Sequence, residues 1–123
     1  MPESNTPKFR SPNQDEFWMS ERIYVTELMN APEEPNLSLA KFRVLEGVTT
    51  QLHSIGVEEW YVIEKGVGRM NIDGNKFDVS PGDCFKIEPH QPQQITNTGT
   101  DDLVFQSMCI PRWTPDTYKN LED

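Results

Sequence analysis

The sequence predicts an all-β fold, and three features of the chain support that prediction. Short runs of apolar and β-branched residues follow one another from residue 22 to residue 110, each bounded by turn residues. Helical spacing of apolar residues is nearly absent from these runs. Asp73-Gly74 separates two of them, and glycine accepts the positive φ that a two-residue hairpin turn requires. This pattern indicates a sandwich, a jelly roll or a small barrel.

The expected strands can be placed by their apolar runs and by the turn residues between them. They cover residues 22–29, 39–45, 51–55, 60–64, 68–72, 76–79, 84–87, 94–97 and 103–110. In the second run, Ala40, Phe42 and Val44 alternate with charged residues. Because side chains alternate along a strand, this predicts one buried face and one solvated face.

The two ends of the chain differ from this pattern. Residues 1–16 are rich in Pro, Asn and Ser and predict a flexible arm, which leaves residues 17–123 as a single folded domain. Phe17, Trp18 and Met19 need burial, either as a strand on a neighbouring subunit, which is favoured slightly, or as a turn on the barrel. Residues 114–116 (Thr-Pro-Asp) predict a short C-terminal helical turn.

The composition excludes several classes of function. The net charge is −9, from 20 acidic and 11 basic residues, and such a surface repels nucleic acid. No apolar run is long enough to span a membrane, and the N-terminus lacks a secretory pattern, so a cytoplasmic location is expected. Cys84 and Cys109 have no metal-binding or redox spacing. Each lies in an apolar run, which predicts two buried, inert thiols.

Two segments resemble the sequence motifs of the cupin family. The matching positions are Gly47, His53, Glu59 and Gly66 in the first motif, and Gly74, the Pro81-Gly82-Asp83 turn and Asn97 in the second. The resemblance implies a cupin double-stranded β-helix, which is a jelly-roll barrel around a central pocket, and a homodimer. Residues 102–115 are further similar to the tails of small bacterial cupins of the mannose-6-phosphate isomerase-like type.

The resemblance also implies a metal site, from which this chain departs. Cupins hold a divalent transition metal with three histidines and one glutamate. His53 and Glu59 stand at two of these positions, whereas Ile55 and Gln93 replace the other two histidines. Imidazole is a stronger ligand than an amide oxygen. The resemblance therefore implies either a weakly held ion (Zn, Ni, Mn or Fe) on His53, Glu59 and Gln93, or no cofactor.

Strand alternation predicts a polar pocket for a small ligand. Gln51, His53 and Ile55 share one face of their strand, and Glu59 and Tyr61 share a face of the next. The candidate catalytic residues are His53, Glu59 and Tyr61, and the candidate ligand-binding residues are Gln51 and Gln93. His90, the second histidine of the chain, is expected in an exposed loop.

Two hypotheses of function follow. The first is an enzyme that isomerises a sugar or sugar phosphate, either with a metal or with His53 as general base, Glu59 orienting it and Tyr61 as acid. The second is a non-catalytic binding or sensing cupin with a degenerate metal site. The lost second histidine favours the second hypothesis, whereas the retained pair of His53 and Glu59 favours the first. The expected partners are a small molecule and a second copy of the chain, with neither nucleic acid nor a membrane.

Overall fold

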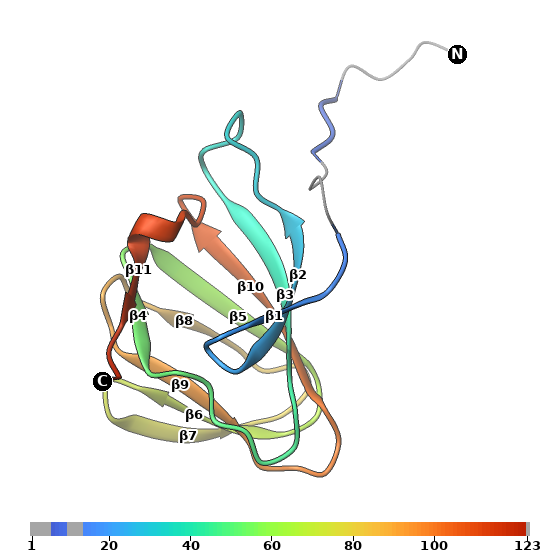
Figure 1. Ribbon diagram of the computed structural model, residues 1–123, viewed down its shortest axis with the longest axis vertical. Helices are drawn as coiled ribbons and strands as arrows, with labels where there is room; N and C mark the ends of the chain where they lie inside the picture. The colour runs from blue at the N-terminus through green and yellow to red at the C-terminus, as the bar shows by residue number, and fades with distance from the viewer. Residues whose placement is uncertain (1–5, 10–13, 123) are drawn as a thin grey trace.

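Two antiparallel sheets face each other in the computed structural model, which describes residues 6–9 and 14–122 (Figure 1). The six-stranded sheet has the order β1-β2-β3-β10-β5-β8. Its strands are β1 (Phe17–Met19), β2 (Ile23–Met29), β3 (Ser38–Val44), β10 (Leu103–Ile110), β5 (Glu58–Lys65) and β8 (Cys84–Ile87). The sequence prediction of an all-β fold is confirmed.

The five-stranded sheet has the order β11-β4-β9-β6-β7. Its strands are β11 (Tyr118–Asn120), β4 (His53–Ile55), β9 (Gln93–Asn97), β6 (Gly68–Ile72) and β7 (Asn75–Val79). Strands far apart in the sequence pair with one another, such as β3 with β10 and β4 with both β9 and β11. This connectivity rolls the two sheets into a jelly-roll barrel.

The β6–β7 hairpin has the turn that the sequence predicts. Ile72 pairs with Asn75, so that Asp73 and Gly74 alone form the loop, and their φ angles are 53° and 85°. Two positive φ angles in succession are what a tight hairpin turn of the right twist requires. The Asn71 side chain accepts a hydrogen bond from the backbone N–H of Gly74 at 3.1 Å, which fixes the turn further.

Gly66 permits the close packing of the turn between β5 and β6. Its φ is 81°, and a Cβ atom there would lie 2.5 Å from the carbonyl oxygen of Asp102. Any other residue would therefore push the β5–β6 turn away from the start of β10. This explains why the last glycine of the first motif is needed for the fold itself.

The hydrophobic core lies between the sheets and receives side chains from both. Its fully buried members are Val44, Ile63, Met70, Ile87, Ile95, Leu103 and Phe105. A second, smaller cluster of Ile55, Val57 and Cys109 packs against Trp113 and Tyr118. As predicted, alternation along β3 and β5 turns one face of each strand toward the interior of the barrel. The polar residues of the site therefore face the same interior as the hydrophobic core.

Both ends of the described chain add a short strand to a sheet edge. β1 pairs with β2 of its own chain, so residues 17–19 form a strand of the barrel's own sheet, neither the expected strand on a neighbouring subunit nor the expected turn, and Phe17 and Trp18 remain 42% and 51% exposed. The predicted C-terminal turn is a 3₁₀ helix over Pro115–Thr117, and β11, which the sequence did not predict, follows it. Most of the predicted arm lies outside the described residues.

Two further expectations concern single side chains. Cys109 is buried as predicted, but the prediction for Cys84 is wrong, because its thiol is exposed. Cys84 lies on the edge strand β8 and faces away from the core beside Val62, while Phe85 and Ile87 point inward. His90 is exposed as expected, in a loop, with a φ of 70°. Among the described residues, no helix is long and apolar enough to cross a membrane.

Candidate functional site

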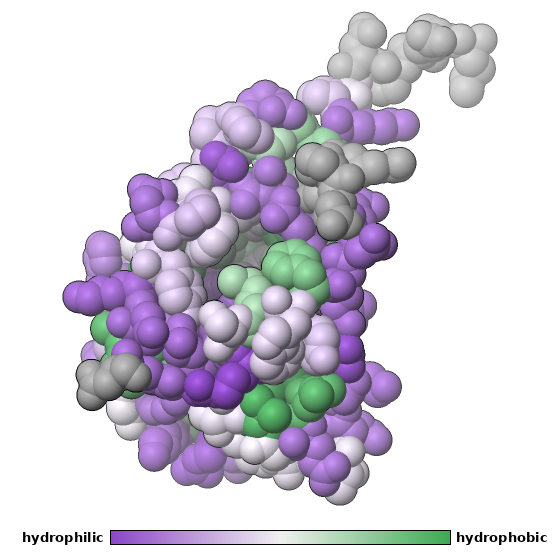
Figure 2. Space-filling view, in the orientation of Figure 1, coloured by the Kyte–Doolittle hydropathy of each residue, from purple (hydrophilic) through white to green (hydrophobic). Residues whose placement is uncertain are grey.

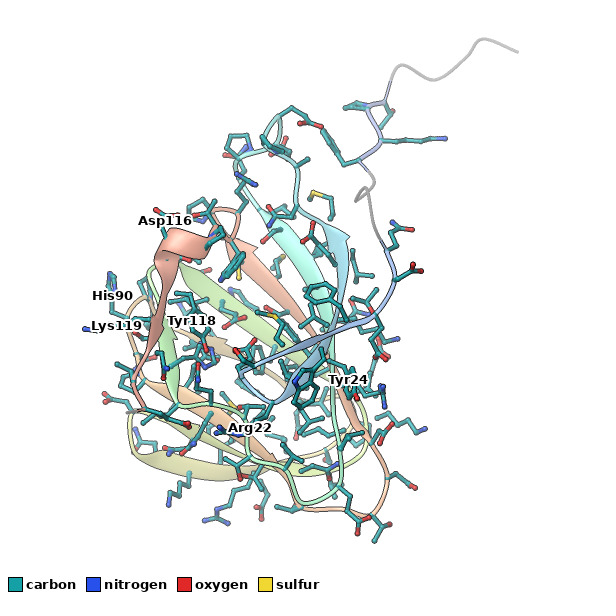
Figure 3. All side chains as sticks on the ribbon, in the orientation of Figure 1. Arg22, Tyr24, His90, Asp116, Tyr118 and Lys119 are labelled. Atoms are coloured by element: carbon teal, nitrogen blue, oxygen red, sulfur yellow. The ribbon has the colours of Figure 1, made fainter. Side chains whose placement is uncertain are left out.

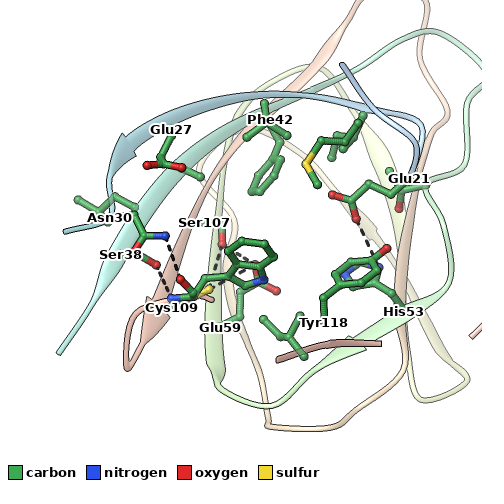
Figure 4. A pocket seen from close by; sticks show the side chains of 18 of the residues that line it. Glu21, Glu27, Asn30, Ser38, Phe42, His53, Glu59, Ser107, Cys109 and Tyr118 are labelled. Carbon is green, nitrogen blue, oxygen red and sulfur yellow. Dashed lines mark hydrogen bonds and ion pairs between the residues drawn. The ribbon is translucent and has the colours of Figure 1, made fainter. Parts of the chain in front are cut away.

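A cavity of about 220 Å³ opens between the two sheets beside the hydrophobic core. Figure 2 shows that the surface is hollowed there, and Figure 4 shows the lining side chains from close by. Its wall is mostly apolar and includes Met19, Ile23, Val25, Leu39, Ala40, Phe42, Ile55 and Trp113. A few polar groups converge on this apolar space, which is the usual appearance of a small-molecule site.

His53 begins β4 and lines one side of the cavity. Its Nδ1 lies 2.7 Å from the backbone carbonyl oxygen of Gln51, so Nδ1 carries the proton and donates it, which leaves Nε2 as an acceptor. The ring of Tyr118 stacks on the imidazole, with 4.9 Å between the ring centroids and 14° between the planes. Burial lowers the pKa of His53, against the opposing effect of the Gln51 carbonyl and of Glu59. The imidazole is therefore neutral. The Gln51 carbonyl fixes its orientation, and the Tyr118 ring packs on one of its faces.

Glu21 faces the same histidine from the turn between β1 and β2. Its Oε2 lies 3.9 Å from Nδ1 of His53, and its side chain is largely buried (Figure 4). Burial raises the pKa of Glu21, and the hydroxyl of Tyr118 partly offsets that effect. The single hydrogen of the Tyr118 hydroxyl is within reach of both Glu21 and the side-chain oxygen of Gln51. These residues come from three separate parts of the chain.

Arg22 joins those separate parts. Its φ is 68°, and its Nε donates to the carbonyl oxygen of Thr49 at 2.8 Å. Its guanidinium also forms a two-pronged ion pair with Glu122, at 3.1 and 2.8 Å, beyond the end of β11. Glu122 in turn accepts the backbone N–H of Leu52 at 2.8 Å. In Figure 3, Tyr118 points into the barrel, whereas its neighbour Lys119 points outward.

Glu59, on β5, is the polar group of the opposite wall. Its two oxygens accept hydrogen bonds from Nε2 of Gln93 at 2.8 Å and from the hydroxyl of Ser107, and the Cys109 thiol lies 3.9 Å away. Burial raises the pKa of Glu59, while the bonds from Ser107 and Gln93 act in the opposite direction. Burial, together with Glu59, also raises the pKa of the Cys109 thiol to about 12, so this thiol is uncharged.

The candidate residues from the sequence divide into two groups. His53, Glu59 and Tyr61 line the cavity, as expected of the candidate catalytic residues. Gln93 is fully buried behind the wall and connects two of them, because its amide oxygen accepts the Tyr61 hydroxyl at 2.8 Å. Gln51 is also outside the set of lining residues, and it reaches the site through His53 and Tyr118. Burial raises the pKa of Tyr61 well above its usual range, which makes it a poor proton donor.

The residues at the metal-ligand positions do not fit a metal ion. Within the described ranges, no three His, Cys, Asp or Glu side chains are gathered to hold one. The donor atoms also have other partners: the amide of Gln93 is shared between Glu59 and Tyr61, and both oxygens of Glu59 accept hydrogen bonds. A metal at this position would have to break that chain of bonds, and Ile55 offers no ligand in exchange.

Fold and cavity together define a β-barrel protein with an open pocket between its two sheets. Residues 40–111 match the cupin domain family, and the chain belongs to that family. A curated relative, an uncharacterised protein of Methanocaldococcus jannaschii, is 36% identical over 86 residues, which are 69% of this chain and 69% of the relative. The comparisons thus establish the family, and the isomerase-like subtype stays a prediction.

Two solved structures show how widely the fold is shared. A predicted oxalate decarboxylase from Thermotoga maritima is 23% identical, with a TM-score of 0.73, covering 85% of this chain and 99% of its own. The protein KdgF from Halomonas sp. is 19% identical, with a TM-score of 0.72, covering 90% of this chain and 98% of its own. At these identities the likeness shows the fold alone.

Glu21, Ser107 and Tyr118 are site residues that sequence reasoning missed. Glu21 and Tyr118 lie outside the cupin match, in segments that carry no motif. Ser107 lies within β10, where alternation of Phe105, Ser107 and Cys109 could have indicated an inward face. For Glu21, the sequence offers only a glutamate in a turn, which is usually solvated.

Proposed function

We propose that this protein binds a small organic molecule in the barrel cavity without a metal ion. The observation that supports the proposal best is the cavity itself, an apolar space of about 220 Å³ onto which His53 and Glu59 converge from the two sheets. A compact ligand with an apolar body and one or two polar groups suits that lining.

The cavity lining does not favour the sugar or sugar phosphate that the sequence suggested as a ligand. None of the described residues that line the cavity is a lysine or an arginine, the side chains that usually receive a phosphate. The apolar wall likewise offers few partners for the many hydroxyl groups of a sugar, and a buried hydroxyl without a partner is costly. A less hydroxylated metabolite is therefore the better candidate.

A second candidate function is catalysis of proton transfer in the same cavity. The specific observation is the state of His53, because its Nδ1–H is held by the Gln51 carbonyl and burial keeps the ring neutral. Nε2 is then available as a general base for isomerisation or epimerisation. His53→Gln is expected to abolish turnover of a bound metabolite while leaving its binding within a fewfold of wild type.

A cavity-filling variant tests the proposed binding function. Ala40 lies on β3 and lines the cavity, so Ala40→Phe should fill the space and abolish ligand-induced thermal shifts found in a metabolite screen. The control is Ala31→Phe, because Ala31 is the other alanine of the chain and lies outside the cavity. If Ala40→Phe folds and keeps the same ligand shifts as wild type, binding takes place elsewhere and the proposal fails.

A further inference from the structure

The charges that face the cavity are of one sign. Glu21 and Glu59 line it and are buried, and the lining residues that the structure describes include neither lysine nor arginine. His53 is the remaining titratable nitrogen among them, and burial disfavours its charged form. At Glu59 the cavity wall therefore presents a carboxyl group with no lysine or arginine among the described lining residues.

The contrast with the protein surface makes this imbalance informative. On the surface, several carboxylates are paired with cationic side chains, as in Arg43–Glu16 at 2.7 Å, Arg22–Glu122 at 2.8 Å and Lys41–Glu64 at 3.0 Å. Glu59 has only uncharged donors, namely the Gln93 amide, the Ser107 hydroxyl and, more distantly, the Cys109 thiol. All three groups donate toward the oxygens of Glu59, and an ionised carboxylate can accept hydrogen bonds from all of them.

Hydrogen bonds from neutral donors offset only part of the cost of burying a carboxylate, and a bound cation would lower that cost further. Glu59 is 5% exposed and borders the cavity, so a cationic group in the cavity can reach it. Five aromatic side chains also line the space: Phe17, Phe42, Tyr61, Trp113 and Tyr118. Aromatic faces attract organic cations, and they provide a surface for an apolar body.

We propose that the ligand of this cavity is a small organic cation, an ammonium compound with a short apolar body, whose charge is received by Glu59. The inference rests on the proposed function, because it assigns a ligand class to the same cavity. A bare metal ion suits the space less well, since the cavity is large, mostly apolar and short of ligands.

Three probes with one apolar body and different charges test this assignment. They are 2-phenylethylamine (cation), 2-phenylethanol (neutral) and phenylacetate (anion), titrated into the full chain by isothermal titration calorimetry. The amine is expected to bind at least about tenfold more tightly than the alcohol, and phenylacetate is expected not to bind. Glu59→Gln should remove the preference for the amine. Glu21→Gln, on the other wall, provides a second variant and should reduce it.

The matched control is Glu46→Gln, which changes the net charge equally but lies on the exposed surface. It should keep the preference of the wild type. Equal binding of amine and alcohol would overturn the inference and leave the proposed binding function intact. An equal loss in Glu46→Gln and Glu59→Gln would also overturn it, because the preference would then come from the overall charge. If no probe binds, the assignment of an amine fails, while the Ala40→Phe test still decides the proposed function.

Discussion

Gln93 stands at an expected metal-ligand position but forms part of a continuous chain of hydrogen bonds instead. A side-chain amide has both a donor and an acceptor, whereas a metal-binding imidazole offers the ion a single lone pair. Here the amide donates to Glu59 and accepts from Tyr61, and Ser107 completes the chain at the other oxygen of Glu59. The substitution therefore stabilises the buried carboxylate without an ion and fixes the Tyr61 hydroxyl as well.

A single replacement should restore metal binding if this description is right. Ile55 lies on β4 beside the cavity, as His53 does, so Ile55→His adds a third strong ligand next to His53 and Glu59. After incubation with Zn²⁺ or Ni²⁺ and dialysis, mass spectrometry should find about one ion per chain in Ile55→His and far less in wild type. Adding His53→Ala should abolish the gain. Stoichiometric metal in the wild type, lost in His53→Ala, would contradict the description.

Glu21 gives a prediction for the dependence of stability on pH. Burial raises its pKa in the folded state, so the folded protein binds this proton more tightly than the unfolded chain does. Its carboxyl therefore favours folding below its ordinary pKa, and that contribution is lost as the pH rises through the raised pKa. Glu21→Gln should then raise the melting temperature by about 3 °C near pH 7.5, and by much less near pH 4.

The measurement is differential scanning calorimetry of wild type and Glu21→Gln over that pH range. Glu46→Gln serves again as the control, because its exposed side chain carries no burial cost. A variant that is destabilised equally at all pH values would show that the carboxyl serves as a hydrogen-bonding group rather than as a buried charge.

At the scale of strands, local sequence determines most of the fold but not the edges of the sheets. The runs 68–72, 84–87 and 103–110 coincide with β6, β8 and β10, because alternation and turn residues mark both ends of each. β11 lacks such a signal. Its three residues form a strand only because β4 offers an open edge, with Asn120 opposite His53.

The difference between local sequence signals and long-range contacts also explains which site residues could be predicted. His53 and Glu59 lie within motifs whose spacing is visible in the sequence, and both line the cavity. Glu21 and Tyr118 reach the site through long-range contacts, since one lies before β2 and the other after the 3₁₀ helix. The direction of the Gln93 amide, which decides against a metal, depends on side-chain packing that no spacing encodes.

At the scale of the whole molecule, β1 is a candidate contact between subunits. It is an edge strand with two half-exposed aromatic residues, Phe17 and Trp18, and an edge strand offers unpaired backbone groups to another chain. We propose that the homodimer expected from the sequence forms through this edge. Trp18→Lys should then shift the protein to a monomer by size-exclusion chromatography with light scattering.

Val62→Lys is the matched control for that experiment. Val62 is also an exposed apolar residue, at 44%, but it lies on β5, away from the β1 edge. It should leave the mass in solution unchanged. A wild-type protein that is monomeric at high concentration would contradict the proposed dimer.

The pairing of β11 with β4 has a consequence for the order in which the protein is made. When the ribosome has synthesised the chain as far as residue 111, every residue of the cupin match is present, yet Tyr118 and Glu122 are not. His53 then lacks its stacking ring, and Arg22 lacks its ion-pair partner. The core of the barrel thus comes from residues 23–105, whereas the cavity wall beside His53 is complete only once residues 118–122 are in place.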